Sequence, residues 1–256
     1  MFYNMKAFLR LGQFFIIYSA AIGILWAVKY GFGLSDYLVP PPSEVLSLAL
    51  KEGLTDLYAA VNTLFVAIMG HGLAVILATI VALVGRSGSW IGTATRTAAY
   101  NLQAYPIVAV APIIFLFLGD GLSSRLLIAS LICYFPLLLS FIGVFSQPVE
   151  EVEHFYRSTG RLGWSLELRI RTFENMDKLV TVVVGSGTTA MVGTIVAEFL
   201  AATMGIGYVI RKALYQSNLA RILLSLFLIG LLSSLYLAVL EAAGKRIKAK
   251  VDPSRS

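Results

Sequence analysis

Long apolar runs dominate this chain, and shorter polar segments separate them. Six runs contain no Asp, Glu, Lys or Arg: residues 11–28, 57–85, 97–119, 126–149, 179–197 and 222–240. Each reaches or approaches the ~20 apolar residues that a helix needs to cross a hydrocarbon core of about 30 Å. Because lipid offers the backbone no hydrogen-bond partners, these runs should be helices rather than open strands. The pattern predicts an all-α, polytopic membrane protein with about six transmembrane helices, over residues 11–30, 57–85, 97–118, 126–146, 179–201 and 221–243.

The segments around the first run need a separate interpretation. Lys6 and Arg10 precede it, as basic residues precede a secretory signal, but the run is long for a signal and no small-residue cleavage site follows. We therefore expect a retained first span. Further on, Ser43 can cap a helix that begins after the prolines 40–42, and the residues behind it form an apolar face. This pattern predicts a short helix lying on the membrane surface.

The distribution of Lys and Arg predicts the orientation. With six spans, fourteen of the twenty basic residues fall on the side of both termini, and that side also holds the polar segment 147–178. By the positive-inside rule, both termini and this segment are cytoplasmic. The cluster Arg211, Lys212 and Arg221 falls on the opposite side and departs from the rule. Anionic lipid accounts for the net charge of +6, so nucleic acid is not expected as a partner.

The segment 147–178 is the longest polar interruption, with six acidic and five basic residues. Val152, Phe155 and Tyr156 fall at helical spacing, and a second apolar stripe follows after Gly160 and Gly163. Two short amphipathic helices separated by glycines would form a compact unit. Such a unit either packs against its own spans or docks on a soluble protein.

Small and hydroxylated residues characterise the fifth predicted span. Gly185, Thr189 and Gly193 share one helical face, and Ser186, Ala190, Thr194 and Glu198 share the adjacent one. Small residues at this spacing permit close helix packing, and they also leave room for a polar solute. Glu198 is either a functional ionisable group within the membrane or a residue at the outer headgroups.

The chain offers little for bond chemistry. Its two glycine-rich segments lack the Gly-Lys-Ser/Thr of a phosphate loop, so ATP should not bind to this chain. Ser186 and His71 could form an intramembrane nucleophile and base, although a lone histidine in a span is more often a packing residue. With Cys133 as the single cysteine and two histidines, an ordinary metal site is not expected. We expect no catalytic, cofactor or metal site.

Several segments together resemble ABC importer permeases of the binding-protein-dependent type, in particular the nitrate/sulfonate/taurine family. The resemblance covers nearly the whole chain from residue 39 onward and rests on the shared order and spacing of six segments. They are residues 39–46 (VPPPSEVL), Tyr105-Pro106 with Pro112, residues 119–125 (GDGLSSR), residues 135–140 (FPLLLS), residues 196–202 (VAEFLAA) and residues 205–210 (GIGYVI).

The cytoplasmic signature of that family is Glu-Ala-Ala, three residues, Gly, nine residues and Ile-x-Leu-Pro. Gly160 and Ile170 keep this spacing, whereas His154-Phe155-Tyr156 replaces Glu-Ala-Ala and Thr172-Phe173 replaces Leu-Pro. In the family this loop forms the coupling helices that sit in a cleft of the ATPase subunit. The resemblance therefore implies that the coupling residues are His154, Phe155, Tyr156, Gly160, Ile170, Thr172 and Phe173.

The resemblance also implies a fold, partners and a location. The fold is the type I ABC importer permease (MetI-like) fold in the bacterial inner membrane. The partners are ATP-binding subunits that hydrolyse ATP, a periplasmic substrate-binding protein and a second permease subunit, identical or different. The translocation path is expected at Tyr105, Pro106, Ser186, Thr188, Thr189, Thr194 and Glu198. The alternative is a stand-alone channel or secondary transporter, for which only Glu198 and His71 could couple ions.

Overall fold

The computed structural model describes residues 2–251, with side chains from residue 12 onward. This range is helical apart from its connecting segments, and it contains no strand. Arg255 of the predicted basic tail lies outside it. The helices in chain order are α1 (Phe2–Phe32), α2 (Pro42–Gly85), α3 (Trp90–Gln103), α4 (Ile107–Leu118), α5 (Leu122–Ser146), α6 (Glu150–Ser158), α7 (Trp164–Glu174), α8 (Met176–Leu200), α9 (Ile206–Tyr215) and α10 (Leu219–Val251).

Five of the described helices are long and apolar enough to cross a membrane: α1 from Gly12, α2, α5, α8 and α10. A sixth crossing is formed only if α3 and α4 together count as one span. The prediction of an all-helical, polytopic membrane protein is therefore confirmed.

The range 97–118, predicted as one span, contains a sharp break. Helices α3 and α4 meet at an angle of 92°. Pro106 precedes α4 in an extended conformation, with φ −72° and ψ 98°. Proline has no N–H to donate, and its ring disfavours helical geometry at the preceding residue, Tyr105. Pro112 lies inside α4 and Pro136 lies inside α5, and neither proline ends its helix. Whether a proline breaks the helical run therefore depends on where in the helix it lies.

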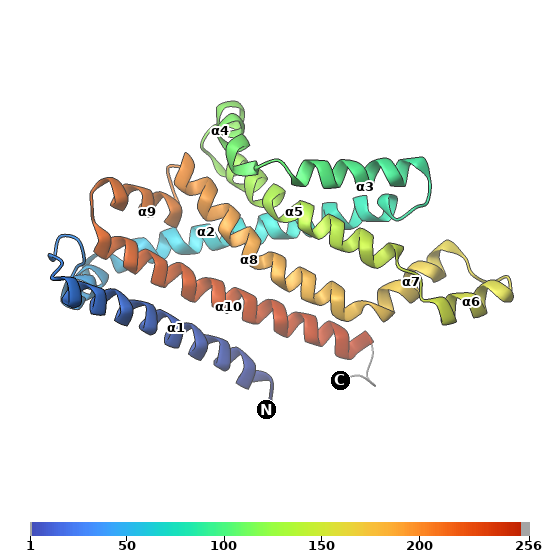
Figure 1. Cartoon of the computed structure of the whole chain (residues 1–256), viewed down its shortest axis with the longest axis horizontal. Helices are drawn as coiled ribbons and strands as arrows, with labels where there is room; N and C mark the ends of the chain where they lie inside the picture. Colours follow the sequence, from blue (N-terminus) through green and yellow to red (C-terminus); the bar gives the residue numbers. More distant parts are fainter. Residues whose placement is uncertain (1, 252–256) are drawn as a thin grey trace.

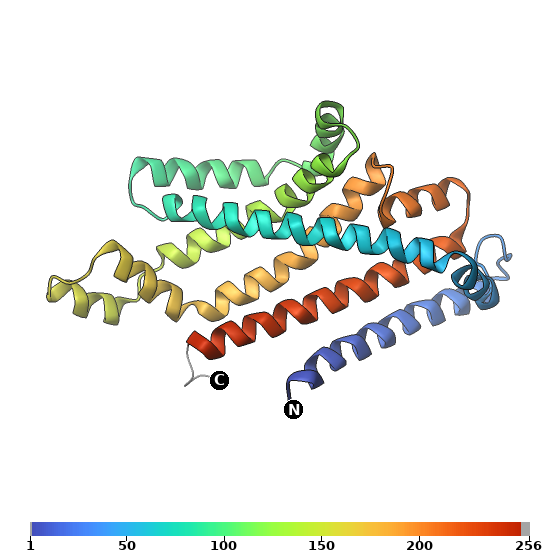
Figure 2. The same ribbon diagram turned by 180° about the vertical axis from the view of Figure 1, so that it is seen from behind.

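The predicted surface helix is not a separate element. Residues 42–56 are continuous with the second span, and α2 has 44 residues. A straight helix of that length would measure about 66 Å, more than twice the hydrocarbon core. Figures 1 and 2 show the first turns of α2 directed differently from its remainder, beside the segment that follows α1. Only part of α2 therefore crosses the apolar layer.

The helices form an elongated bundle with two distinct ends. Helices α6 and α7 extend from one end, here called the α6–α7 end, and α9 lies at the other, here called the α9 end (Figure 1). The turn between α2 and α3 lies toward the α6–α7 end, and the segment 33–41 lies at the α9 end (Figure 2). The start of α1 and the end of α10 lie on the same side of the bundle in both views.

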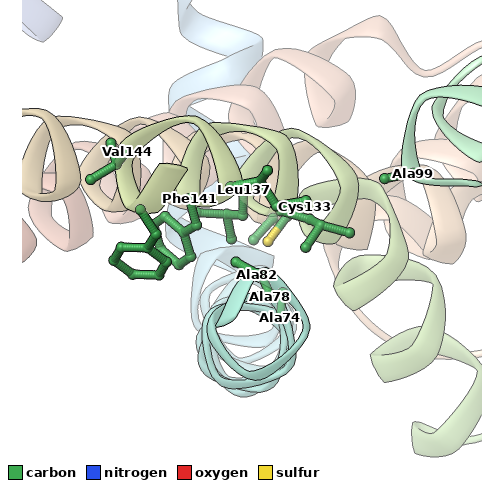
Figure 3. Packing of buried hydrophobic residues seen from close by; sticks show 12 residues of the cluster. Ala74, Ala78, Ala82, Ala99, Cys133, Leu137, Phe141 and Val144 are labelled. Atoms are coloured by element: carbon green, nitrogen blue, oxygen red, sulfur yellow. The ribbon is translucent and has the colours of Figure 1, made fainter. Parts of the chain in front are cut away.

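The core is centred on α2 and α5. Ala74, Ala78 and Ala82 repeat every four residues on one face of α2, and they pack against Cys133, Leu137 and Phe141 of α5 (Figure 3). Gly70 allows an even closer approach, because a Cβ there would lie 2.9 Å from that of Ala129. Small residues on α2 thus let large residues of α5 fill the interface.

Candidate functional site

Residues 147–178 fold into the two predicted short helices, α6 and α7, joined by a turn. Gly160 in this turn has φ +68°, a conformation that residues with a side chain rarely adopt. Its N–H donates to the carbonyl of Arg157 at 3.1 Å. The glycine ends α6 and lets the chain reverse into α7.

The ion pair between Glu153 and Arg171 joins α6 to α7. Arg171 donates through Nε to Oε1 of Glu153 at 2.7 Å and through Nη2 to Oε2 at 2.9 Å. Its Nη1 donates to the carbonyl of Phe145, in the last turn of α5, at 2.8 Å. Both charged residues are buried, at 2% and 7% exposure. The hydrogen bond from Arg171 holds the pKa of Glu153 below its usual value, and the same bond raises the pKa of Arg171.

A second arginine joins α7 to the end of α2. Arg86 follows the last residue of α2 and donates through Nη2 to Oε1 of Glu167 at 2.6 Å. The same oxygen lies 2.8 Å from Nη2 of Arg171. The guanidinium of Arg86 also lies 5.6 Å from the ring centroid of Trp164. The four charges therefore connect α2, α5, α6 and α7. Sequence reasoning missed this network, because Arg86 and Glu167 are 81 residues apart.

The coupling residues implied by the sequence differ in exposure. Phe155 is 62% exposed and Phe173 is 39% exposed. Trp164 and Val152, which were not among the implied residues, are also exposed, at 61% and 37%. His154 and Gly160 are exposed, whereas Tyr156, Ile170 and Thr172 are half-buried. The α6–α7 pair thus presents large apolar side chains on a polar, water-facing unit.

The path residues expected on α8 do not share one environment. Ser186, Thr194 and Glu198 are buried, Thr188 is exposed and Thr189 is half-buried. The open side of α8 instead carries Thr181, Gly185, Thr188 and Val192. Tyr105 and Pro106 are exposed at the break between α3 and α4. The structure therefore divides the predicted path residues into a buried set and an open set.

Two hollows lie beside the first part of the open side of α8, up to Gly185. One, of about 540 Å³, lies between α5 and α8 and includes Ser140, Gly143 and Thr181 in its lining. The other, of about 420 Å³, lies between α8 and α10 and includes Thr181 and Gly185. Small side chains create this space, because Gly143 and Gly185 have no atom near the position of a Cβ.

Ser186 takes part in a hydrogen-bond chain with His71 and Tyr236. Its hydroxyl donates to the carbonyl of Val183 at 2.9 Å, and its oxygen lies 2.8 Å from Nε2 of His71. With the single hydroxyl proton of Ser186 assigned to the Val183 carbonyl, Nε2 is assigned as the donor to Ser186. Nδ1 is then the acceptor for the Tyr236 hydroxyl, 2.6 Å away. This direction of bonding is the reverse of a serine nucleophile with a histidine base, so the chain of bonds joins α2, α8 and α10 structurally.

Glu198 lies in a second buried polar cluster, at the α9 end. It pairs with Arg125, and its Oε2 accepts from the hydroxyl of Thr63 at 2.7 Å and from the N–H of Gly207 at 3.0 Å. Arg125 also donates to Oδ1 of Asn62 at 2.7 Å. Arg125 and Glu198 are 1% and 0% exposed. Sequence reasoning singled out Glu198 but not its partners; a basic residue at the start of an apolar run was the available signal.

Comparison with known proteins agrees with this architecture. No family model matches the chain. Over 125 residues it is 34% identical to the riboflavin transport system permease protein RibX of Chloroflexus aurantiacus, which covers 48% of this chain and 46% of that protein. Over 222 residues it is 23% identical to the formylaminopyrimidine transport permease protein ThiX of Halalkalibacterium halodurans, which covers 85% and 88%. Its homologues are transport permeases.

These similarities give the class of the protein but not its subgroup. The chain is a multi-pass membrane protein related to transport permeases, not to enzymes. The match spans less than half the length of the riboflavin permease. Neither relative is named for nitrate, a sulfonate or taurine, so that subgroup stays a prediction.

Proposed function

We propose that this chain is the membrane-spanning permease subunit of an ATP-driven ABC importer. The observation that carries the proposal is the α6–α7 pair, which extends from one end of a permease-like bundle and exposes Phe155 and Trp164. Large apolar side chains on a water-facing unit are typical of a docking surface. A separate ATPase subunit would bind there, and this chain would hydrolyse no ATP.

The open side of α8 is the proposed translocation path. Thr181 and Thr188 supply hydroxyl groups, and Gly185 supplies space between the two hollows. In this assignment Ser186, Thr194 and Glu198 support the path helix from behind. A second permease subunit would close the path on its open side, and a periplasmic binding protein would deliver solute at the α9 end.

The internal polar clusters favour this proposal over a secondary transporter. Ion coupling would need a group such as Glu198 or His71, the two candidates that the sequence suggested. Glu198 is already occupied by Arg125, Thr63 and a backbone N–H. Both ring nitrogens of His71 are occupied as well. If a partner subunit hydrolyses ATP to drive transport, neither Glu198 nor His71 needs to exchange protons or ions.

The names of the relatives favour a polar heterocyclic solute. The relatives are named for riboflavin and for formylaminopyrimidine. Hydroxyl groups such as that of Thr181 line the two hollows beside Lys178, Lys245 and Lys248, so the path surface is polar. Calorimetry on a binding protein encoded beside this chain would test the class. Binding of riboflavin but not of nitrate or taurine is expected, and the converse would contradict it.

The main test is copurification. A tagged full-length chain isolated in mild detergent is expected to bring down an ATPase, and uptake in cells should stop when ATP is depleted. Gly160→Pro should leave inserted protein without the ATPase, because proline cannot adopt φ +68°. Isolation with no ATPase, together with uptake that survives ATP depletion, would favour the channel or secondary transporter.

The path assignment has its own test. Thr188→Trp and Thr189→Trp should retain the ATPase and block uptake, because an indole would fill the space beside Gly185. Ile17→Trp is the control, since Ile17 is 68% exposed on α1, away from α8. Unimpaired uptake in both threonine variants would remove this side of α8 from the path.

A further inference from the structure

The charges between α6–α7 and the bundle form a branched network rather than separate pairs. Arg171 is the branch point, since its three nitrogens reach Glu153 on α6, Glu167 on α7 and the carbonyl of Phe145 on α5. Arg86 adds the end of α2 through Glu167. A displacement of α6 would therefore pull on the ends of α2 and α5 through these hydrogen bonds and ion pairs.

The geometry of the Glu153–Arg171 pair restrains direction as well as distance. Two parallel N–H···O bonds join the planar guanidinium to the carboxylate, so neither group can rotate without breaking one of them. Both side chains are buried, and a lone buried charge is strongly unfavourable. The pair therefore resists bending between α6 and α7 much more than a surface ion pair would.

The network is distinct from the exposed surface of α6 and α7. Phe155 and Trp164 present much of their side chains to water, whereas Glu153 and Arg171 are turned toward the bundle. Helices α2 and α5, to which the network leads, pack closely through the alanine face of α2 (Figure 3). Apart from Trp164, whose ring lies 5.6 Å from the Arg86 guanidinium, binding of a partner and transmission of its motion thus fall on different residues.

We infer that Arg171, with Glu153 as its partner, is a positioning residue that makes α6 and α7 move as one body with the ends of α2 and α5. This inference rests on the proposed function, in which an ATPase moves α6 and α7. The exposed aromatic residues hold the ATPase, and the buried pair transmits its displacement to the helices that form the core.

The test separates binding from transmission. Full-length chains carry Cys133→Ser and Thr188→Cys, so that a thiol reagent reports on the open side of α8. The variants Arg171→Met and Glu153→Gln are purified with the ATPase that accompanies the unaltered chain. In the chain that carries only Cys133→Ser and Thr188→Cys, ATP should change the rate at which the thiol reagent labels Thr188→Cys. In Arg171→Met and Glu153→Gln this ATP-dependent change should be lost, while the ATPase still copurifies. The double variant should be no worse than either single one, because the two residues act as a unit.

The controls are Arg169→Met and Glu151→Gln, exposed neighbours of the same residue types, which should behave as the unaltered chain does. A full ATP-dependent change in Arg171→Met would overturn the inference, and so would loss of the ATPase from both variants. If the Arg171→Met chain does not insert into the membrane, the labelling of Glu153→Gln decides the test, since glutamine keeps the size of the glutamate side chain. Absence of any ATPase from the unaltered chain would instead contradict the proposed function.

Discussion

Two buried charged residues at the α9 end, Arg125 and Glu198, should contribute strongly to the stability of the protein. Arg125 and Glu198 are completely enclosed, and the carboxylate has hydrogen bonds from Arg125, Thr63 and the N–H of Gly207. Gly207 is the second residue of α9, so Glu198 also stabilises the start of that helix. The pair thus ties the turn between α8 and α9 to α2 and α5.

Removal of one member of this pair should be costly. Arg125→Met leaves the Glu198 carboxylate buried without its cation, and we expect a loss of about 3–5 kcal/mol in the free energy of unfolding. Denaturant unfolding of the purified protein in detergent measures it. Arg161→Met, on the exposed turn after α6, should change stability by less than about 0.5 kcal/mol. A small effect of Arg125→Met would show that the Glu198 side chain does not depend on Arg125 for its burial.

Gly205 is the residue of this turn least able to accept a side chain. Its φ is +93°, and a Cβ would overlap the carboxyl group of Glu198. Gly205→Ala should therefore destabilise the protein by about 2 kcal/mol or more, the sum of backbone strain and displacement of Glu198. Gly53→Ala is the matched control, because Gly53 lies inside α2 with open space around it. There, alanine should be neutral or stabilising by up to about 1 kcal/mol.

Among whole elements, α8 shows how packing gives a helix two different sides. Gly187 lets α10 approach closely, since a Cβ there would lie 2.7 Å from Leu240 Cδ1. Ser186 bonds to His71 and, through it, to Tyr236. These contacts set the rotation of α8 about its axis, and the opposite side with Thr188 is left open.

Tyr236→Phe tests this account of α8. It removes the donor to His71 but keeps the ring, so we expect a loss of about 0.6 to 1.7 kcal/mol in stability. It should also change the labelling rate of Thr188→Cys, because α8 loses a restraint on its rotation. Tyr58→Phe on α2 is the control, since Tyr58 is 77% exposed. Unchanged stability and unchanged labelling together would count against the hydrogen-bond chain.

The contact between α6 and α7 should loosen only in acid, below the pKa of an unfolded glutamate. The pKa of Glu153 is lowered chiefly by its hydrogen bond from Arg171. Its stabilising contribution is therefore fully present above the pKa of an unfolded glutamate, about 4.3, and is lost as the pH falls through the lower folded value. Amide hydrogen exchange of α6 against pH measures this. Glu153→Gln should abolish the acid-dependent step, and persistence of the step would assign it to another group.

For the whole molecule, the decisive question is which end faces the cytoplasm. The structure places α6 and α7 at one end of the bundle and α9 at the other, so the basic cluster around Arg211 is far from the predicted cytoplasmic loop (Figure 1). Arg221 is paired there with Glu52 and Asp56, at 2.6 and 2.7 Å. The positive-inside rule counts Lys and Arg regardless of such pairing, so this cluster still departs from the rule.

Cysteine labelling can establish the orientation. Cys133 is buried, and Cys133→Ser would provide a cysteine-free chain. In that background, Gln216→Cys should react with an impermeant maleimide on intact cells, and Ser158→Cys should react only after permeabilisation. Both positions are exposed, so the membrane alone accounts for the difference. The reverse pattern would place both termini outside.

Local patterns were sufficient for much of the architecture. Five of the six charge-free runs matched single helices, because a span requires about 20 consecutive apolar residues, a property of one continuous segment. The two helices around Gly160 followed from spacing and glycine alone. The ion pairs that hold α6 and α7 were not predictable, because Glu153 and Arg171 look like ordinary exposed charged residues until their burial is known.

The sequence by itself therefore determined the class of the protein, the number and order of its apolar segments and the place of its polar unit. These depend on the cost of unpaired backbone in lipid and on composition within single segments. Only the tertiary structure decided which side of α8 is open and that His71 and Glu198 are fully engaged. Those outcomes arise from contacts between residues far apart in the chain, such as His71 and Tyr236, and no local pattern specifies them.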